Sequence, residues 1–363
     1  MLPAFGLYTH IRANRRRSAL LIAGLFVLVL VLTYGGSLVW RGWWFGLPKN
    51  PGPAHLQAFL EAAARDTLLL SPVVIAATAA WVFVSTRFHQ ALIDAVTGAT
   101  EIERSADPRL YSMLENLCIS RGLVTPHLGI IETPAINAFA SGMRQGQYRV
   151  TVTRGLLDAL DDEELEAVLA HELTHIRNED VRLMVVAGVV AGVISFFGEL
   201  VFRWLDVGRI RSSGDGDRKK GSGAMPAILI GLALIAVAWG LSLVIRFALS
   251  RRREYLADAG AVELTKNPDA MISALLKIEG KGELPATPSG IMEMCVDNPR
   301  SGFADLFATH PSIADRVAAL ERYAGGHRPA TPFLPPGVEA MLSRSGSAET
   351  RAPSTPWGPA PQA

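Results

Sequence analysis

The stretch 161–177, DDEELEAVLAHELTHIR, decides how the water-soluble part of this chain folds. Its first turn is acidic, and Glu164 stands three residues after Asp161, which is the spacing of a helix-capping box. Apolar side chains then recur on one helical face, at Leu165, Val168, Leu169, Leu173 and Ile176. The sequence therefore predicts an amphipathic helix that begins at Asp161 and packs one side into a core.

The same helix carries the pattern HExxH, from His171 to His175. Positions i and i+4 of a helix lie on one face, so both imidazoles can point at one ion. Zinc favours imidazole nitrogen and, at a catalytic site, takes three protein ligands and keeps one position open. Glu172 lies between the histidines, where it can accept a proton from water instead of binding the metal. The alternative is two helical histidines with no role, but the capped helix favours one Zn²⁺ per chain.

A third ligand must come from a distant part of the chain. No histidine follows His175 within a dozen residues, so the extended form of the motif is absent. A glutamate on a second helix is the usual other solution, and Glu254 stands in the stretch 250–258, SRRREYLAD. Asp258 lies one turn further along and can accept a hydrogen bond from a ligating histidine. An acid after three arginines is also typical of a solvated ion pair, and spacing alone leaves both interpretations open.

Apolar residues are concentrated in four blocks. Hydrophobic residues make up 49% of the 363 residues, charged residues 19%, and the mean hydropathy is +0.25. The first block, 18–40, exceeds a bilayer core of roughly 30 Å at about 1.5 Å per residue and is too long for a signal peptide. The block 67–85 also suits a span, 183–198 is short enough to be a core helix, and 226–245 suits a span. About four membrane-associated helices are expected.

Charge and cysteine content exclude several classes of protein. Lys+Arg number 35 and Asp+Glu number 34, a balance that excludes nucleic-acid binding through bulk basicity. Cys118 and Cys295 are too few and too far apart for a disulfide scaffold or a paired-cysteine metal site. Short runs at 127–132, 136–141 and 148–153 have the character of strands, the last two as a hairpin. The expected fold class is mainly α with a small β-sheet.

Four motifs, in this order along the chain, resemble those of the HtpX-type membrane zinc metallopeptidases, which are relatives of the CAAX prenyl endoproteases. They are NAFASG at 137–142, HELTH at 171–175 with Asp180 five residues on, REYLAD at 253–258, and THP at 309–311 followed by Arg316. The motifs cover about residues 123–320, and the paired amino-terminal spans of that family match residues 18–85. The resemblance implies an integral membrane, zincin-like metallopeptidase.

The resemblance also implies roles for single residues. Glu254 becomes the third zinc ligand, beside His171 and His175, and Asp258 becomes an acid that hydrogen-bonds a ligand. Asp180 either has the same task or lies at the helix end.

Beyond the ligands, the resemblance makes His310 and Arg316 candidate catalytic donors to the oxyanion that forms when water attacks a peptide carbonyl. The THP motif has a structural alternative, in which Pro311 starts a helix over 312–323 that Thr309 or His310 caps. An edge strand is expected to hold substrate by strand addition, and its residues are Asn137, Ala138, Phe139 and Ala140.

Six parts are expected along the chain. They are a cytoplasmic N-terminus (1–17), two transmembrane helices with a short loop (18–85), a first catalytic part with the HExxH helix (86–182), a helical hairpin of the third and fourth apolar segments (183–245), a second catalytic part with the third zinc ligand (246–324), and a disordered proline-rich tail (325–363). Four arginines before the first block favour a cytoplasmic catalytic domain. Strict alternation of spans would then place six basic residues within 203–220 outside the cell. Either the charge rule is broken and both segments cross the membrane, or they form a hairpin that does not cross it; the hairpin is the favoured alternative.

These observations predict a membrane-bound zinc endopeptidase, and the resemblance implies quality control of misfolded membrane proteins at the cell inner membrane. Its partners would be protein substrates and the lipid bilayer, with no nucleic acid; the sequence does not indicate an oligomeric state. The alternatives are a processing protease with few substrates and a catalytically inactive zinc-binding membrane scaffold. The intact Glu172 argues against the scaffold.

Overall fold

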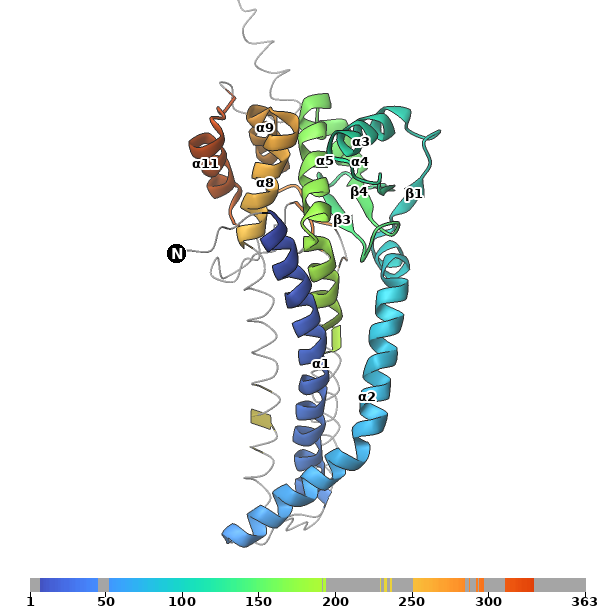
Figure 1. Ribbon diagram of the computed structural model, residues 1–363, viewed down its shortest axis with the longest axis vertical. Coiled ribbons are helices and arrows are strands. Elements are labelled where there is room, and N and C mark those ends of the chain that lie inside the picture. The colour runs from blue at the N-terminus through green and yellow to red at the C-terminus, as the bar shows by residue number, and fades with distance from the viewer. Residues whose placement is uncertain are drawn as a thin grey trace, which may run out of the picture. The chain divides into compact units, whose positions relative to one another are not determined.

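The computed structural model describes residues 7–44, 52–190, 251–284 and 311–329, together with residues 192, 193, 229, 232, 233, 236, 287, 292 and 294–296. Residues up to His327 form one compact unit. The described part is mostly helical with one small mixed sheet, so the predicted fold class is confirmed (Figure 1). His310 and nearly all of 191–250 lie outside the described residues, as does the chain from residue 330 onward.

Two long helices open the chain, α1 (Leu7–Trp44) and α2 (Pro53–Thr97), and they pack against each other (Figure 1). Both are long and apolar enough to cross a membrane, with best-window mean hydropathies of 2.4 and 2.1. They extend beyond the predicted spans because each continues into polar sequence at one or both ends. At about 1.5 Å per residue, the 45 residues of α2 are far longer than a bilayer core. The carboxyl-terminal end of α2 therefore reaches the sheet.

The sheet has four strands in the order β1-β2-β4-β3. Strand β2 (His127–Ile131) pairs in parallel with β4 (Arg149–Thr153), and β3 (Ala138–Ser141) pairs with β4 as the predicted antiparallel hairpin. Strand β1 (Thr100–Ile102), which the sequence did not indicate, pairs antiparallel with β2. The strand β3 is thus last in the order, which matches the predicted edge position.

The HExxH helix is α5 (Asp162–Arg177), and it begins as predicted. The Asp161 carboxylate accepts a hydrogen bond from the Glu164 N–H at 2.9 Å, and the Glu164 carboxylate accepts one from the Asp161 N–H at 2.9 Å. Burial on α5 exceeds the one face that the amphipathic pattern predicts, since every residue from Ala167 to Ile176 is buried. The reason is tertiary: α3 (Pro108–Arg121), the sheet and two later helices enclose it.

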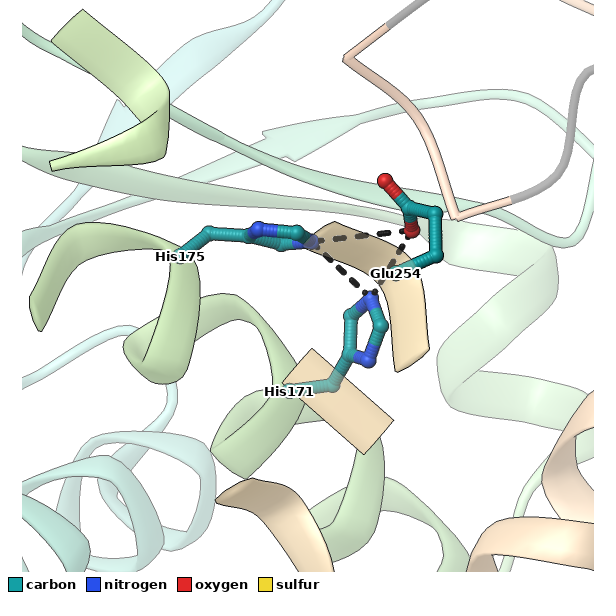
Figure 2. A group of neighbouring side chains, drawn as sticks. All are labelled: His171, His175 and Glu254. Carbon is teal, nitrogen blue, oxygen red and sulfur yellow. Dashed lines mark hydrogen bonds and ion pairs between the residues drawn. The ribbon is translucent and has the colours of Figure 1, made fainter. Parts of the chain in front are cut away.

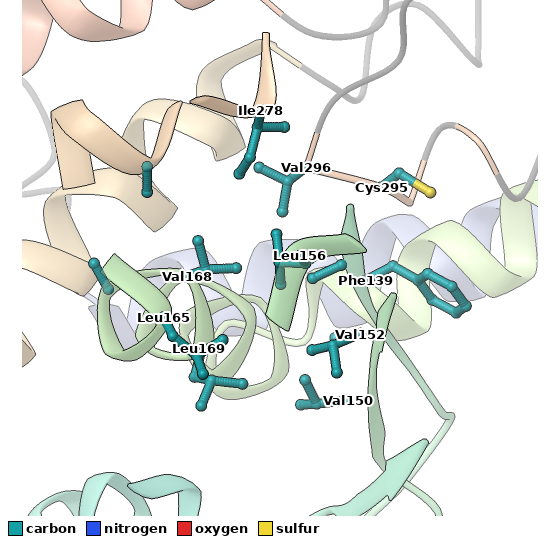
Figure 3. Close-up of a cluster of buried hydrophobic side chains, with 14 of the residues drawn as sticks. Phe139, Val150, Val152, Leu156, Leu165, Val168, Leu169, Ile278, Cys295 and Val296 are labelled. Atoms are coloured by element: carbon teal, nitrogen blue, oxygen red, sulfur yellow. The ribbon is translucent and has the colours of Figure 1, made fainter. Parts of the chain in front are cut away.

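One large cluster of buried hydrophobic side chains joins α5 to the sheet (Figure 3). Val150 and Val152 of β4 face α5, and α4 (Arg154–Ala159) adds Leu156. Ile278 comes from α9 (Pro268–Ile278), whose Lys277 donates a hydrogen bond to the Glu164 carboxylate at 2.6 Å. Packing from both sides holds the HExxH helix rigidly, which a site that must fix ligand positions requires.

The helix α8 (Arg251–Thr265) packs along α5, and α11 (Ile313–Ala324) packs on α8 and α9. Gly260 makes the approach of α8 to α5 possible, because a Cβ there would lie 2.4 Å from Cγ2 of Thr174. The predicted cap of the last helix is wrong. Ser312 caps it, since its hydroxyl accepts a hydrogen bond from the Asp315 N–H at 3.1 Å.

Candidate active site

Three donor atoms from two helices converge at one point (Figure 2). His171 and His175 lie on successive turns of α5, and Glu254 lies in the first turn of α8. The two imidazole Nε2 atoms are 3.2 Å apart, and Glu254 Oε2 lies 3.6 Å from Nε2 of His171 and 3.7 Å from Nε2 of His175. All three side chains are buried. The structure thus brings together residues that about 80 positions of sequence separate.

This triangle has the size of a zinc site. The centre of the triangle, in its plane, lies about 2.0 Å from each of the three atoms, and zinc bonds imidazole nitrogen and carboxylate oxygen at about 2.0–2.2 Å. Three protein donors leave a fourth position open, as catalytic zinc sites do. The donor set therefore fits one divalent cation.

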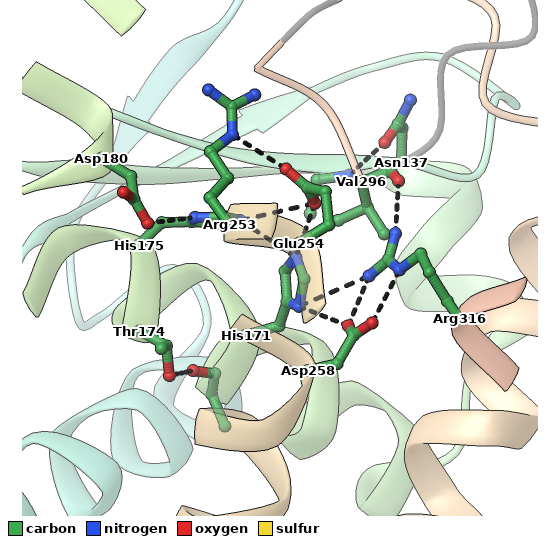
Figure 4. Close-up of polar contacts among 12 residues, drawn as sticks. Asn137, His171, Thr174, His175, Asp180, Arg253, Glu254, Asp258, Val296 and Arg316 are labelled. Carbon is green, nitrogen blue, oxygen red and sulfur yellow. Dashed lines mark hydrogen bonds and ion pairs between the residues drawn. The ribbon is translucent and has the colours of Figure 1, made fainter. Parts of the chain in front are cut away.

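The outer nitrogens of both rings face carboxylates (Figure 4). Nδ1 of His171 lies 2.9 Å from Asp258 Oδ1, and Nδ1 of His175 lies 3.1 Å from Asp180 Oδ2. A carboxylate at Nδ1 assigns the proton to that nitrogen and leaves the Nε2 lone pair directed at the triangle. Two lone pairs 3.2 Å apart repel each other, so this arrangement calls for a cation between them.

Buried negative charge exceeds buried positive charge around the triangle, which also favours a cation there. Among the described residues that surround the triangle, the buried side chains include four carboxylates and two guanidiniums, which are Glu172, Asp180, Glu254 and Asp258, and Arg253 and Arg316. Buried charge is costly unless it is paired, and one divalent cation would neutralise the two remaining negative charges. Burial opposes a proton on His175, but the Glu254 and Asp180 carboxylates outweigh it and raise the pKa of that ring to about 10. The pocket therefore attracts positive charge, either as a bound cation or as a proton on His175.

Arg316 supports the site from behind Asp258. Its Nε and Nη2 donate to the two oxygens of the Asp258 carboxylate at 2.8 and 2.6 Å, and its Nη1 donates to the Val296 carbonyl at 3.0 Å (Figure 4). Burial works against ionisation of Asp258, but the Arg316 charge outweighs burial and lowers the pKa of the carboxyl. This placement, beside the ring nitrogen that faces away from the triangle, favours positioning of Asp258 over the predicted donation to substrate.

Glu172 is the unpartnered acid of the site. Its side chain is buried, with 1% of the residue surface exposed, and neither carboxylate oxygen has a hydrogen-bond partner in the described part of the chain. Burial raises the pKa of Glu172, while the imidazoles of His171 and His175 oppose that shift. A buried carboxylate without a protein partner is free to accept a proton from a water or substrate that enters the site.

The predicted substrate strand is only partly open. Asn137 acts within the fold: its side chain donates to the Gly282 carbonyl at 2.7 Å and accepts from the Ala138 N–H at 3.0 Å. On the outer edge of β3, the Val296 N–H donates to the Ala138 carbonyl at 3.0 Å, and Phe139 bridges to Cys295. Residues 295 and 296 therefore occupy the Ala138–Phe139 end of this edge.

Sequence reasoning missed three contributors to the site. Arg253 donates from Nε to Glu254 Oε1 at 3.0 Å, Val296 binds Arg316, and Asn14 of α1 donates to Asp180 at 2.7 Å. Arg253 is the first residue of the REYLAD motif, next to Glu254, and this position could have indicated its contact. Nothing in the pattern around Val296 or Asn14 distinguishes them. His310 lies outside the described residues, so its predicted place in the site stays a prediction.

Comparison with known proteins agrees with this geometry. Residues 104–324 match the model of Peptidase family M48. A Protease HtpX homolog of Bacteroides fragilis is 36% identical over 327 residues, covering 88% of this chain and 99% of the relative. The Protease HtpX homolog of Levilactobacillus brevis is 33% identical over 323 residues, covering 87% and 99%.

A solved structure, the crystal structure of S. mikatae Ste24p, is also similar, with 21% identity and a TM-score of 0.43 over 69% of this chain and 58% of that one. The resemblance that the four motifs predicted is therefore confirmed by sequence. The chain belongs to peptidase family M48 and is a metallopeptidase that carries two helices long and apolar enough to cross a membrane.

Proposed function

We propose that this chain is a zinc-dependent endopeptidase of the cell inner membrane, with its catalytic domain in the cytoplasm. The observation that carries the proposal is the triangle of His171, His175 and Glu254, whose size suits zinc, beside the buried and unpartnered Glu172. The relatives named Protease HtpX homolog match over nearly their whole length, which supports the same activity here.

In this proposal each residue has a defined task. His171, His175 and Glu254 hold the zinc, and Asp258 and Asp180 keep the two rings in the tautomer that ligation needs. Bound zinc would supply a Lewis acid that polarises the peptide carbonyl and makes water more acidic. Glu172 takes a proton from the water that attacks the carbonyl carbon, and it returns that proton to the amine nitrogen as the C–N bond breaks. Water and peptide thereby become a carboxylic acid and an amine, and transfer of the acid's proton then gives a carboxylate and an ammonium group.

His310 and Arg316 are the two residues considered as hydrogen-bond donors to the developing oxyanion. His310 remains the predicted donor, on the resemblance alone. Arg316 is assigned a positioning task instead, since three of its N–H groups already bind Asp258 and Val296.

The proposed substrates are misfolded membrane proteins, and they would bind as extended strands. Substrate pairing is expected at the Ala140–Ser141 end of β3, because residues 295 and 296 already pair at the other end. We retain the predicted non-crossing hairpin at 183–245 and the catalytic parts at 86–182 and 246–324; the predicted tail cannot begin at residue 325, because the compact unit extends to His327. A processing protease with few substrates is the alternative within this class.

The deciding experiment separates metal binding from cleavage. Glu172→Gln keeps the three ligands and removes the base, so the purified full-length variant should retain one zinc per chain and lose cleavage of an unfolded model protein in detergent. Wild-type protein and an exposed-acid variant, Glu263→Gln, serve as controls; Glu263 lies on α8 and pairs with Arg121 away from the triangle. Equal cleavage by wild type and Glu172→Gln, or no cleavage by either, contradicts the proposal, and zinc without cleavage in the wild type favours the scaffold.

A further inference from the structure

A short turn carries Asp180 to the metal-binding histidine. The helix α5 ends at Arg177, Asn178 and Glu179 form the turn, and helical structure resumes at residue 180. Glu179 has a positive φ of 58°, a conformation that side chains other than glycine adopt at a cost. The turn therefore needs support from outside to keep Asp180 Oδ2 at 3.1 Å from Nδ1 of His175.

That support comes from the amino-terminal end of α1. Asn14 is buried, with 1% of its surface exposed, although it lies among four arginines. Its Nδ2 donates to the Asn178 carbonyl at 3.0 Å and to Asp180 Oδ1 at 2.7 Å. The neighbouring Arg15 donates from Nε to both oxygens of the Glu179 carboxylate, at 2.8 and 2.9 Å. Two consecutive residues of α1 thus bind all three residues that lead from α5 to the next helix.

The Asp180 carboxylate is consequently held from two sides. One oxygen accepts from Asn14 and the other faces the ring of His175. A primary amide has two N–H donors on one nitrogen, which matches the two acceptors that Asn14 reaches. Apolar side chains of similar size supply no donor, and an acidic side chain would bring a second negative charge to Asp180.

We propose that Asn14 is a positioning residue of the metal site, which orients His175 through Asp180. This inference rests on the proposed zinc site at His171, His175 and Glu254. It makes the first membrane helix a working part of the catalytic centre in addition to an anchor. The competing view is that Asn14 only ties α1 to the catalytic part and has no influence on the metal.

The test measures zinc affinity as well as cleavage, in full-length protein in detergent. Asn14→Leu keeps the branching at Cγ and removes both hydrogen bonds. The matched control is Ser18→Ala, one turn further along α1, because the Ser18 side chain is also buried and its hydroxyl has no partner in the described part of the chain.

Zinc affinity is measured by competition with a chelator, and thermal unfolding of the metal-free protein monitors folding. Asn14→Leu should weaken zinc binding about tenfold and lower kcat with little change in KM, since altered support of a ligand typically costs about 10–100-fold. Ser18→Ala should match wild type in every readout.

A double-variant cycle separates positioning from a structural tie. In an Asp180→Ala background, Asn14→Leu should cause no further loss of zinc affinity, because the route through Asp180 is already broken. Unchanged zinc affinity in Asn14→Leu, or equal losses in both backgrounds, overturns the inference. If Asn14→Leu does not fold, Asn14→Gln carries the test, since it keeps the amide but displaces it by one methylene. A wild type that binds zinc and cleaves nothing refutes the proposed peptidase, while the affinity cycle still decides the role of Asn14.

Discussion

Replacing Gly260 with alanine is expected to push α8 away from α5. The new Cβ would lie 2.4 Å from Cγ2, 2.7 Å from Oγ1 and 3.1 Å from Cβ of Thr174. Ordinary contacts between carbon atoms are about 3.5–4.0 Å, so the helices must separate by roughly 1 Å. Thr174 cannot rotate away easily, because its side chain is β-branched and its hydroxyl donates to the Ala170 carbonyl at 2.8 Å.

The separation should reach the metal site. Thr174 precedes His175 on α5, and Glu254 lies six residues before Gly260 on α8, so the clash acts between the two helices that supply the ligands. A metal site tolerates deviations of only about 0.2 Å in its ligand distances. Overpacking of this kind costs about 1–3 kcal/mol in the free energy of unfolding. We expect that loss together with at least a tenfold decrease in zinc affinity.

Thermal unfolding and chelator competition on the detergent-solubilised protein measure both effects. The matched control is Gly188→Ala, where no atom lies within 4 Å of the added Cβ; helix propensity should make it neutral or slightly stabilising. Thr174→Ala should partly rescue Gly260→Ala, since it removes the two shortest contacts. If Gly260→Ala has the thermal midpoint and the zinc affinity of the wild type, α8 does not pack on α5 as closely as described.

Three further predictions use other parts of the molecule. Asp258→Asn removes the charge that faces Nδ1 of His171 and binds Arg316, so zinc affinity or kcat should fall about 10–100-fold, whereas Glu263→Gln on the same helix should not change either. Removing metal with a chelator should lower the midpoint of thermal unfolding, and zinc at about 1,000 times its Kd should raise the free energy of unfolding by about 4 kcal/mol. Equal midpoints with and without metal would contradict the excess of buried negative charge around the triangle. Gly214→Cys should react with a membrane-impermeant maleimide only after cells are opened, and labelling of intact cells would refute the non-crossing hairpin. Background labelling should be low because both native cysteines are buried, and burial raises the pKa of Cys118 to about 11.

Local sequence was sufficient wherever the deciding interactions are local. The capping box of Asp161 and Glu164 spans three residues, and the two histidines are brought together by one turn of helix, so both features were predictable without tertiary contacts. The β3–β4 hairpin also joins neighbours in sequence. Strand β1 was missed because three residues, of which two are exposed, contain no alternation to detect.

Contacts between residues far apart in the sequence could not be predicted from residue spacing alone. Glu254 follows three arginines and is separated from the histidines by two apolar blocks, so its residue type and spacing alone favoured a solvated ion pair. Only the order of four motifs, through the resemblance, favoured the metal site. The prediction that Thr309 or His310 caps the last helix was wrong because it made Pro311 the first helical residue. Ser312, after the proline, is the cap, and its hydroxyl accepts a hydrogen bond from the Asp315 N–H.

Asn14 shows why support of the ligands is harder to predict than the ligands. A run of basic residues before an apolar block reads as a signal for membrane orientation, and that signal conceals one neutral side chain. Its function depends on a contact 166 residues away, at a turn whose positive φ no composition reveals. Ligands must have particular chemistry, so few residue types fit. A supporting residue needs only a donor at the right place, and only the fold determines which donor that is.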